Sequence, residues 1–539
     1  MRARLLAPWL APAIAFAGAC GQPPTTSAPT PSIAPAPSTT PPTTASMPST
    51  TASASSAAST LASASASPAE PPKPPAPRLS TTHLWSRILE RPSWSAATIG
   101  WVRAGSRIER AATKTEQPGC ATGWYSVKPG GFVCDGAEGV TTDLDDPAVA
   151  AAARYPPDLA SALPYGYGTS ESAPFYARIP TAAEMKQAEG DVAAHLKEWA
   201  ARSDGPDATS RPPRTALPLA AVPEFLRDHA QAPSLLERSL GKQLTAGSAW
   251  STMGLAFVAE FEAEGRDWYL TTEQLLVPAD RMRAVRLSDF HGIELAKPGE
   301  VGEHLPIAWV RAHEPVKVLR LEGDRVVDAE LTLPFRSHVA IADAALTLKG
   351  QRYLELTAPP TSWPKERWLV QASDVTRVDA EGAVPSGVGA NDAWVDVSLR
   401  DQTLVYYEGT HPTFATLISS GFGADHGTPM GLWRIYAKHV SSRMERAGKP
   451  VEKPGDTYDP PYRLDDVPWV QYYSGPYALH TSYWHDEFGQ PHSHGCINLS
   501  PVDARTIFER TTPSVPSGWH GVVAGYAGAG AGTWVRIRW

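Results

Sequence analysis

Cysteine is scarce in this sequence, because the 539 residues include only four: Cys20, Cys120, Cys134 and Cys496. Cys20 ends a segment with the features of an export signal, and Cys120 and Cys134 lie fourteen residues apart in one short region. Cys496 is therefore left without an obvious partner. An unpaired thiol with histidines close by is typical of a cysteine nucleophile.

Charged residues are also sparse and contain no long run of one sign. The 48 Lys and Arg residues against 56 Asp and Glu residues give a formal net charge of −8. Proteins that bind nucleic acids usually gather their basic residues in one stretch or on one face. The sequence therefore predicts no nucleic-acid partner, and it gives no support for binding an anionic polymer by charge.

The first twenty residues lack an apolar run long enough to cross a bilayer. Two arginines precede the apolar stretch from Leu5 to Ala19, which two prolines interrupt. A span needs about 18 to 20 apolar residues, so residues 1–20 are predicted to be a signal peptide. The small residues before Cys20 resemble a bacterial lipoprotein signal, although Ala17 departs from that pattern. This resemblance implies lipidation of Cys20 and a membrane anchor, and the alternative is plain cleavage and secretion.

Residues 21–78 have almost no large apolar side chains and consist mostly of Ser, Thr, Ala and Pro. Such a segment buries too little apolar surface to offset the entropy of ordering it. We expect a disordered tether, which would let an anchored enzyme reach a fixed polymer. A plain spacer, with or without glycosylation, is the alternative.

Residues 79–145 show short strand patterns separated by turns, including 123–127 and 130–134. This glycine-punctuated texture resembles bacterial SH3-like domains. Cys120 and Cys134 flank one of these strands in an exported chain, so a disulfide between them is expected, with two reduced thiols as the alternative.

Residues 146–390 show little recognisable chemistry. Thr181 and Glu184 form a capping-box pattern, and apolar residues spaced on one helical face continue to Trp199. Strand-sized segments follow and predict one or two further β-rich modules. Either cell-wall binding or structural spacing fits them, and nothing identifies a ligand.

Residues 391–539 alternate clearly as strands, with a meander at 394–399, 402–407 and 414–419. A helical pattern is present only late, at 501–510, where proline occupies the first turn. The whole chain is therefore predicted to be mainly β and multidomain.

The chemistry of this last region is concentrated in one motif. Its sequence is Ser493-His494-Gly495-Cys496-Ile497-Asn498, and His480 lies sixteen residues before the cysteine. Together with a Thr-Pro-x-Gly segment at 428–431, this motif resembles the catalytic domain of the L,D-transpeptidases, bacterial enzymes that cross-link peptidoglycan stem peptides. The resemblance implies a β-sandwich-like catalytic domain over residues 391–539.

The physical roles of the central residues support the same reading. A free thiol is only a few per cent thiolate at neutral pH, so an imidazole that accepts its proton makes Cys496 a better nucleophile. His480 comes from a separate strand, and the resemblance makes it the general base. The resemblance gives Thr481 the task of holding the other ring nitrogen, through its carbonyl or side chain. His494 is expected to position the substrate or assist the oxyanion.

The remaining motif residues are expected to support the pocket. The backbone N–H groups of Gly495 and Cys496 could stabilise an oxyanion, with help from Tyr462. The resemblance assigns loop or substrate contacts to three further residues: Ser493, Asn498 and Trp484. Purely structural roles are equally open for them, as buried turn residues in the case of Ser493 and Asn498 and as a core aromatic in the case of Trp484. The charged residues between His480 and Ser493 could tune the choice of substrate, but we expect them to be solvated loop residues.

The resemblance implies two-step acyl transfer without a metal or cofactor. The thiolate would attack a tetrapeptide stem, D-alanine would leave, and an amine of a neighbouring stem would resolve the thioester to give a 3-3 cross-link. Resolution by water, attachment of a protein to the wall, and a non-catalytic wall-binding lipoprotein are the alternatives. A zinc site at His480, His494 and Cys496 is disfavoured, because no accompanying zinc motif is present. The sequence carries no signal for an oligomeric state.

Overall fold

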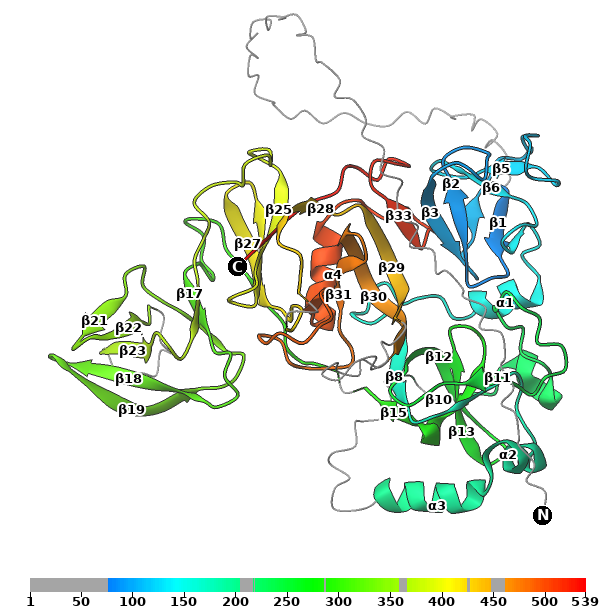
Figure 1. The fold of residues 1–539 in the computed structure, drawn as a ribbon, viewed down its shortest axis with the longest axis horizontal. Helices are drawn as coiled ribbons and strands as arrows, with labels where there is room; N and C mark the ends of the chain where they lie inside the picture. Colours follow the sequence, from blue (N-terminus) through cyan, green and yellow to red (C-terminus); the bar gives the residue numbers. More distant parts are fainter. Residues whose placement is uncertain are drawn as a thin grey trace, which may run out of the picture. The chain divides into compact units, whose positions relative to one another are not determined.

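The structure, a computed structural model, describes residues 76–203, 217, 219–285, 287–357, 366–423, 427–446 and 461–539. The predicted signal segment, Cys20 and the tether up to residue 75 lie outside this part. The described part is mainly β with few helices (Figure 1), which confirms the fold class predicted from the sequence. Within it, no helix is both long and apolar enough to span a membrane.

The first region is a set of short strands followed by one helix. These are β1 (Arg78–Thr81), β2 (Trp85–Leu89), β3 (Thr98–Arg103), β4 (Ile108–Glu109), β5 (Trp124–Ser126), β6 (Phe132–Cys134), β7 (Val140–Thr141) and α1 (Pro147–Ala153). β3 also pairs with β33 (Gly521–Val523) from the end of the chain. Trp519 and Val522 belong to the same apolar core as Ile88 and Val102. The C-terminal segment therefore completes this core, and the SH3-like assignment stays a prediction.

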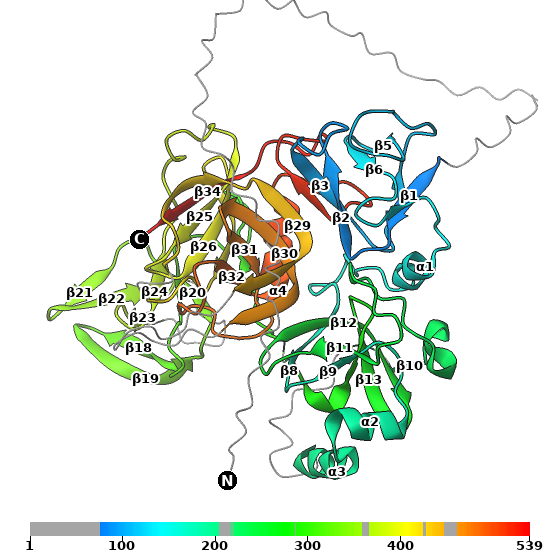
Figure 2. The same cartoon turned by 45° about the vertical axis from the view of Figure 1, so that its right-hand side comes forward.

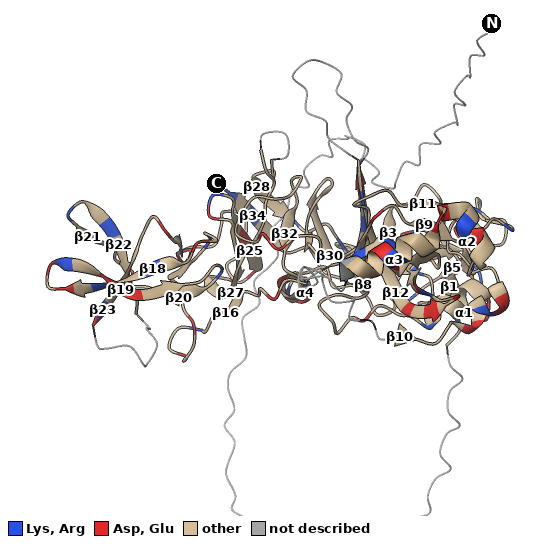
Figure 3. Cartoon of the chain, turned by 90° about the horizontal axis from the view of Figure 1, so that it is seen from below, with Lys and Arg blue, Asp and Glu red and all other residues tan. Residues whose placement is uncertain are grey.

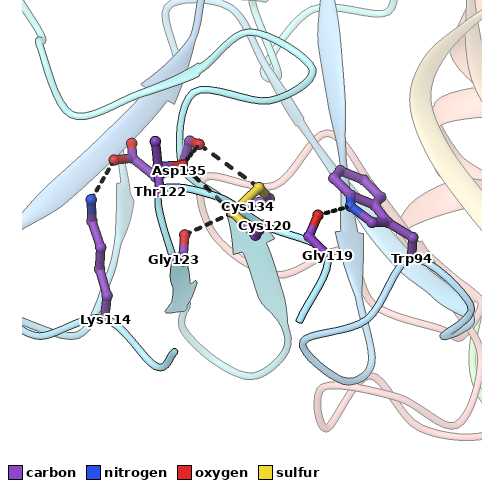
Figure 4. Close-up of a disulfide and its surroundings, with 8 residues drawn as sticks. All are labelled: Trp94, Lys114, Gly119, Cys120, Thr122, Gly123, Cys134 and Asp135. Carbon is purple, nitrogen blue, oxygen red and sulfur yellow. Dashed lines mark hydrogen bonds and ion pairs between the residues drawn. A yellow bond between two sulfur atoms is a disulfide. The ribbon is translucent and has the colours of Figure 1, made fainter. Parts of the chain in front are cut away.

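The expected disulfide is present between Cys120 and Cys134, with their Cα atoms 5.7 Å apart (Figure 4). The bond lies beside the antiparallel pair β5 and β6, in which Trp124 is the register partner of Cys134. Nearby, the Trp94 indole donates to the Gly119 carbonyl at 2.6 Å. The disulfide thus fixes a loop whose own apolar core is small.

The second region combines a sheet with two helices. Its elements are β8 (Gly166–Ser170), β9 (Pro174–Tyr176), α2 (Ala182–Glu189), α3 (Val192–Ser203), β10 (Leu219–Ala220), η2 (Glu224–His229), β11 (Thr245–Ser248), β12 (Gly254–Ala263), β13 (Arg266–Thr271), β14 (Leu276–Pro278), η3 (Ala279–Arg281) and β15 (Met282–Ala284). The capping box at Thr181 and Glu184 is present. The single helical face expected as far as Trp199 is divided, because Gly190 takes a φ of 84° and ends α2.

A third region has its own apolar core and is called here the β17–β24 module, residues 307–378. Its strands are β17 (Ile307–Trp309), β18 (Val316–Glu322), β19 (Arg325–Leu333), β20 (His338–Ala340), β21 (Leu346–Leu348), β22 (Gln351–Glu355), β23 (Arg367–Gln371) and β24 (Thr376–Val378). β18 and β19 both carry basic and acidic residues (Figure 3). The Lys317 ammonium, for example, lies 2.7 Å from the Asp328 carboxylate.

The last region contains two sheets around one core. The first sheet has the order β16-β27-β26-β25-β34-β28. Its strands are β16 (Ile293–Glu294), β25 (Ala393–Ser398), β26 (Thr403–Glu408), β27 (His411–Leu417), β28 (Gly431–Arg434) and β34 (Trp534–Arg538). The meander predicted from the sequence is β25, β26 and β27.

The second sheet of this region carries His480 and the end of the Ser493–Asn498 motif. It contains β29 (Ala437–Arg446), β30 (Tyr462–Ser474), β31 (Tyr477–Thr481) and β32 (Ile497–Leu499), with α4 (Pro501–Arg510) against β30 and β31 (Figure 2). Ser500 caps α4, and the helix begins at Pro501, as predicted. Leu479, Ile497 and Ile507 lie in the core shared by both sheets and α4.

Candidate active site

Two neighbouring parallel strands bring His480 and Cys496 together. His480 lies on β31 opposite Asn498 of β32, and Cys496 directly precedes β32. Because side chains alternate between the two faces of a strand, Leu479 and Ile497 point into the core. His480, Cys496 and Asn498 therefore share the opposite face of this sheet.

The turn before the thiol is held by Ser493. Its hydroxyl donates to the Cys496 carbonyl at 2.5 Å and accepts the Gly495 N–H at 3.1 Å. Gly495 has a φ of 114°, a region that residues with a Cβ rarely adopt. A Cβ at Gly495 would also lie 2.4 Å from Cε1 of Tyr477. Both the backbone conformation and the packing therefore require glycine in this turn.

The His480 ring is arranged to act as a proton acceptor. Its Nδ1 lies 2.8 Å from the Thr481 carbonyl, which can only accept, so Nδ1 carries the hydrogen and Nε2 keeps its lone pair. Burial lowers the pKa of His480 to about 4, partly opposed by this hydrogen bond. The imidazole is consequently neutral at pH 7 and available as a base.

Cys496 is partly exposed and lies at the end of the segment between β31 and β32. Its sulfur is 3.9 Å from the Pro476 carbonyl. Burial raises the pKa of Cys496 to about 11, although a hydrogen bond from the Ala478 backbone acts in the opposite direction. Thiol and imidazole are therefore both neutral at rest, and the proton must move as the sulfur attacks.

Aromatic rings lie beside His480 and beside His494, which is two residues before Cys496. The exposed His494 ring is 5.3 Å from the Tyr462 ring and 5.6 Å from the Phe422 ring. Burial and the nearby Cys496 raise the pKa of Tyr462. Trp484 lies 5.8 Å from His480, measured between ring centroids. The expected aromatic residues therefore lie in two contacts, Tyr462 beside His494 and Trp484 beside His480.

A comparison with protein-family models assigns this region. The model described as YkuD, the L,D-transpeptidase catalytic domain, matches residues 392–537. The C-terminal region is thus similar to an L,D-transpeptidase catalytic domain. The matched segment covers β25 to β34 and includes the two strands that carry His480 and Cys496.

Solved L,D-transpeptidase structures give weaker similarities. A crystal structure of an Enterococcus faecium L,D-transpeptidase mutant is 22% identical, with a TM-score of 0.20, over 27% of this chain and 50% of that chain. The chain thus spans half the length of that relative. An L,D-transpeptidase from Mycobacterium smegmatis is 17% identical, with a TM-score of 0.20, over 37% of this chain and 99% of that chain. No curated protein matches the chain significantly.

The L,D-transpeptidase domain contains another histidine beside the motif, the half-buried His485, whose role the sequence did not indicate. Nε2 of His485 lies 2.8 Å from the Asn498 side-chain amide, and Nδ1 accepts the Glu487 N–H at 3.1 Å. Burial, followed by the neighbouring His492 and His480, lowers the pKa of His485 to about 3. A neutral imidazole therefore supports the last residue of the motif.

The acidic residues beside His485 are partly exposed, as expected, but each also has an ion-pair partner. Asp486 forms a bidentate ion pair with Arg336, and Glu487 lies 3.0 Å from His313. Both partners belong to the β17–β24 module. No local pattern could have revealed them, because 150 and 174 residues separate the paired groups.

Among the described residues, no group of three or more His, Cys, Asp or Glu side chains is arranged to hold a metal ion. The two histidines are held differently, since His480 bonds the Thr481 carbonyl and the His494 ring lies beside the rings of Tyr462 and Phe422.

Proposed function

We propose that this chain is an exported L,D-transpeptidase whose nucleophile is Cys496. The observation that carries the proposal is the parallel pairing of β31 and β32, which puts His480 and Cys496 on one face of a domain that matches this family. The donor substrate would be a peptidoglycan tetrapeptide stem, and the acceptor would be an amine of a neighbouring stem.

In the first step, Sγ of Cys496 attacks the carbonyl carbon of the third stem residue, and Nε2 of His480 takes the thiol proton. The tetrahedral intermediate collapses as the carbon–nitrogen bond breaks. The departing D-alanine amine receives the proton from His480, and a thioester remains on Cys496. No oxidant, metal or other co-reactant is needed for this balance.

In the second step, an acceptor amine attacks the thioester carbonyl and displaces the sulfur. His480 takes a proton from the amine and returns one to the thiolate, which restores the resting enzyme. The Gly495 N–H is already bonded to Ser493, so we assign the oxyanion chiefly to the Cys496 N–H. His494 and Tyr462 would flank the substrate, and Trp484 would form a wall near His480.

The chain outside this domain fits a location in the cell envelope. The disulfide between Cys120 and Cys134 is of a kind that persists in oxidising compartments. Export through residues 1–20, lipidation of Cys20 and tethering through residues 21–78 are part of the proposal. The N-terminal SH3-like module and the domain limits at 79–145, 146–390 and 391–539 remain predictions.

The test is to incubate the exported chain with disaccharide-tetrapeptide and to analyse the products by mass spectrometry. A cross-linked dimer with loss of one D-alanine supports the proposal. A trimmed tripeptide alone indicates a carboxypeptidase that uses the same thioester, and no product under any condition contradicts both. His480→Ala should abolish product, whereas His494→Ala should retain a measurable rate. The reverse result would exchange their roles.

A further inference from the structure

The loop between His480 and the nucleophile is anchored from outside the L,D-transpeptidase domain. The anchored segment, residues 485–490, is called here the rim loop. Phe488 is fully buried in a core that also contains Trp309 of β17 and Trp394 of β25. This core joins the β17–β24 module to the first sheet of the catalytic region.

Polar contacts from the same module hold the rim loop on both sides of Phe488. Nε of Arg311 donates to the Gly489 carbonyl at 2.7 Å, and the Gln490 amide donates to the Arg311 carbonyl at 3.0 Å. These two bonds fix the backbone after Phe488. Both bonds join Arg311 to the rim loop, so both must break before the two segments can separate.

Before Phe488, the main anchor is Arg336. Its two terminal nitrogens donate to both oxygens of Asp486, and the second bond measures 3.0 Å. The Arg336 side chain is only 15% exposed, whereas that of Asp486 is 42% exposed, and the guanidinium lies over the rings of Phe290 and Phe335. A bidentate, stacked and largely buried arginine is geometrically specific, unlike an exposed ion pair. The pair between His313 and Glu487 is exposed on both sides and contributes little.

The rim loop is in turn hydrogen-bonded to the catalytic motif. The Glu487 N–H donates to Nδ1 of His485, and the Glu487 carbonyl accepts the Ser419 hydroxyl at 2.8 Å. The other ring nitrogen of His485 meets the Asn498 amide at 2.8 Å. Asn498 is in turn the register partner of His480. The hydrogen bonds thus run from the rim loop to Asn498, which lies next to His480 in the paired strands of the active face.

We propose that the β17–β24 module is a positioning element of the active site, with Arg336 as its principal positioning residue. Arg336 holds Asp486, and thereby the His485 ring that supports Asn498 beside His480. The module is thus a working part of the acyl-transfer unit as well as a spacer or wall-contacting domain. The catalytic consequence rests on the proposed function, whereas the structural coupling does not.

The test compares Arg336→Gln and Asp486→Asn with the matched control Arg367→Gln. Arg367 also makes a bidentate ion pair, but with Glu355 inside its own module. A small misplacement of catalytic groups can cost up to about 100-fold in rate. We expect each of the first two variants to lower kcat about tenfold with KM changed less than twofold. The double variant should be no slower than either single variant, and the control should match the wild type.

Hydrogen exchange provides a readout that needs no substrate. Peptides covering residues 485–498 should exchange faster in Arg336→Gln, while the control should leave them unchanged. The inference is overturned if Arg336→Gln affects neither kcat nor this exchange more than Arg367→Gln does, or if the two single variants are additive. If the wild type makes no product, the proposed function fails, but the exchange result still decides the coupling. Should Arg336→Gln not fold, Asp486→Asn tests the same contact from the other side.

Discussion

The neutral state of the catalytic pair can be tested by alkylating Cys496 with iodoacetamide over a range of pH. The thiolate reacts, and the pKa of Cys496 is raised to about 11 by burial. The thiolate fraction at pH 7 is then only about 0.01%, against a few per cent for a free thiol of pKa about 8.5. The rate should therefore climb about tenfold per pH unit, and it should still climb nearly tenfold between pH 9 and 10.

The alternatives give different curves. A free thiol would gain less than about twofold over that last interval, because it is already mostly ionised. A resting thiolate–imidazolium pair would give a nearly constant rate from about pH 5 to pH 8. Peptide mass analysis of the site containing Cys496 measures the rate directly. A plateau between pH 6 and 8 would refute the neutral pair.

Enzyme turnover should show the complementary effect on the acid side. Burial lowers the pKa of His480 to about 4, so protonation removes the base only when the pH falls towards that value. The acid limb of kcat/KM should accordingly lie near pH 4 and not near 6.5, the value of an exposed histidine. His480→Ala should leave the alkylation curve above pH 7 unchanged while lowering acyl transfer about 10²-fold to 10⁴-fold. An acid limb at pH 6.5 would contradict the burial argument.

Three further changes test the local structure. Ser493→Ala removes a donor to Cys496 and an acceptor for Gly495, so unfolding measurements should show a loss of about 1–3 kcal/mol and kcat should fall; an unchanged kcat would exclude the proposed locking of the turn. Gly495→Ala should lose most activity, and adding Tyr477→Ala should restore only part of it, because the φ strain remains. Replacing Cys120 and Cys134 by serine should lower the stability of the N-terminal region by about 3 kcal/mol in denaturant titrations. The serine variant should be about as stable as the wild type with its disulfide reduced.

Elements with local signals could be predicted from the sequence. The helix at Pro501–Arg510 begins with a proline after a serine cap, and short turns separate the three strands of the predicted meander. The division of the expected helix at Gly190 could have been anticipated only by weighing one glycine against a continuous apolar face. Local conformational preference is sufficient to define such elements.

Contacts between distant segments could not be predicted in this way. The pairing of β3 with β33 joins segments about four hundred residues apart, and the Arg336 and Asp486 pair spans 150 residues. Likewise, a charged loop residue looks the same in sequence whether it faces water or an arginine. The candidate nucleophile and base could be named from one motif, but the network that supports them required the tertiary structure.

The central claim is that Cys496 forms a thioester with a stem peptide. The most direct measurement is the intact mass of the exported chain after a brief incubation with disaccharide-tetrapeptide. We expect an added mass equal to the substrate less D-alanine, located on the peptide containing Cys496 and absent from Cys496→Ala. Product formation without any adduct on Cys496, or an equal adduct on the Cys496→Ala variant, would contradict it.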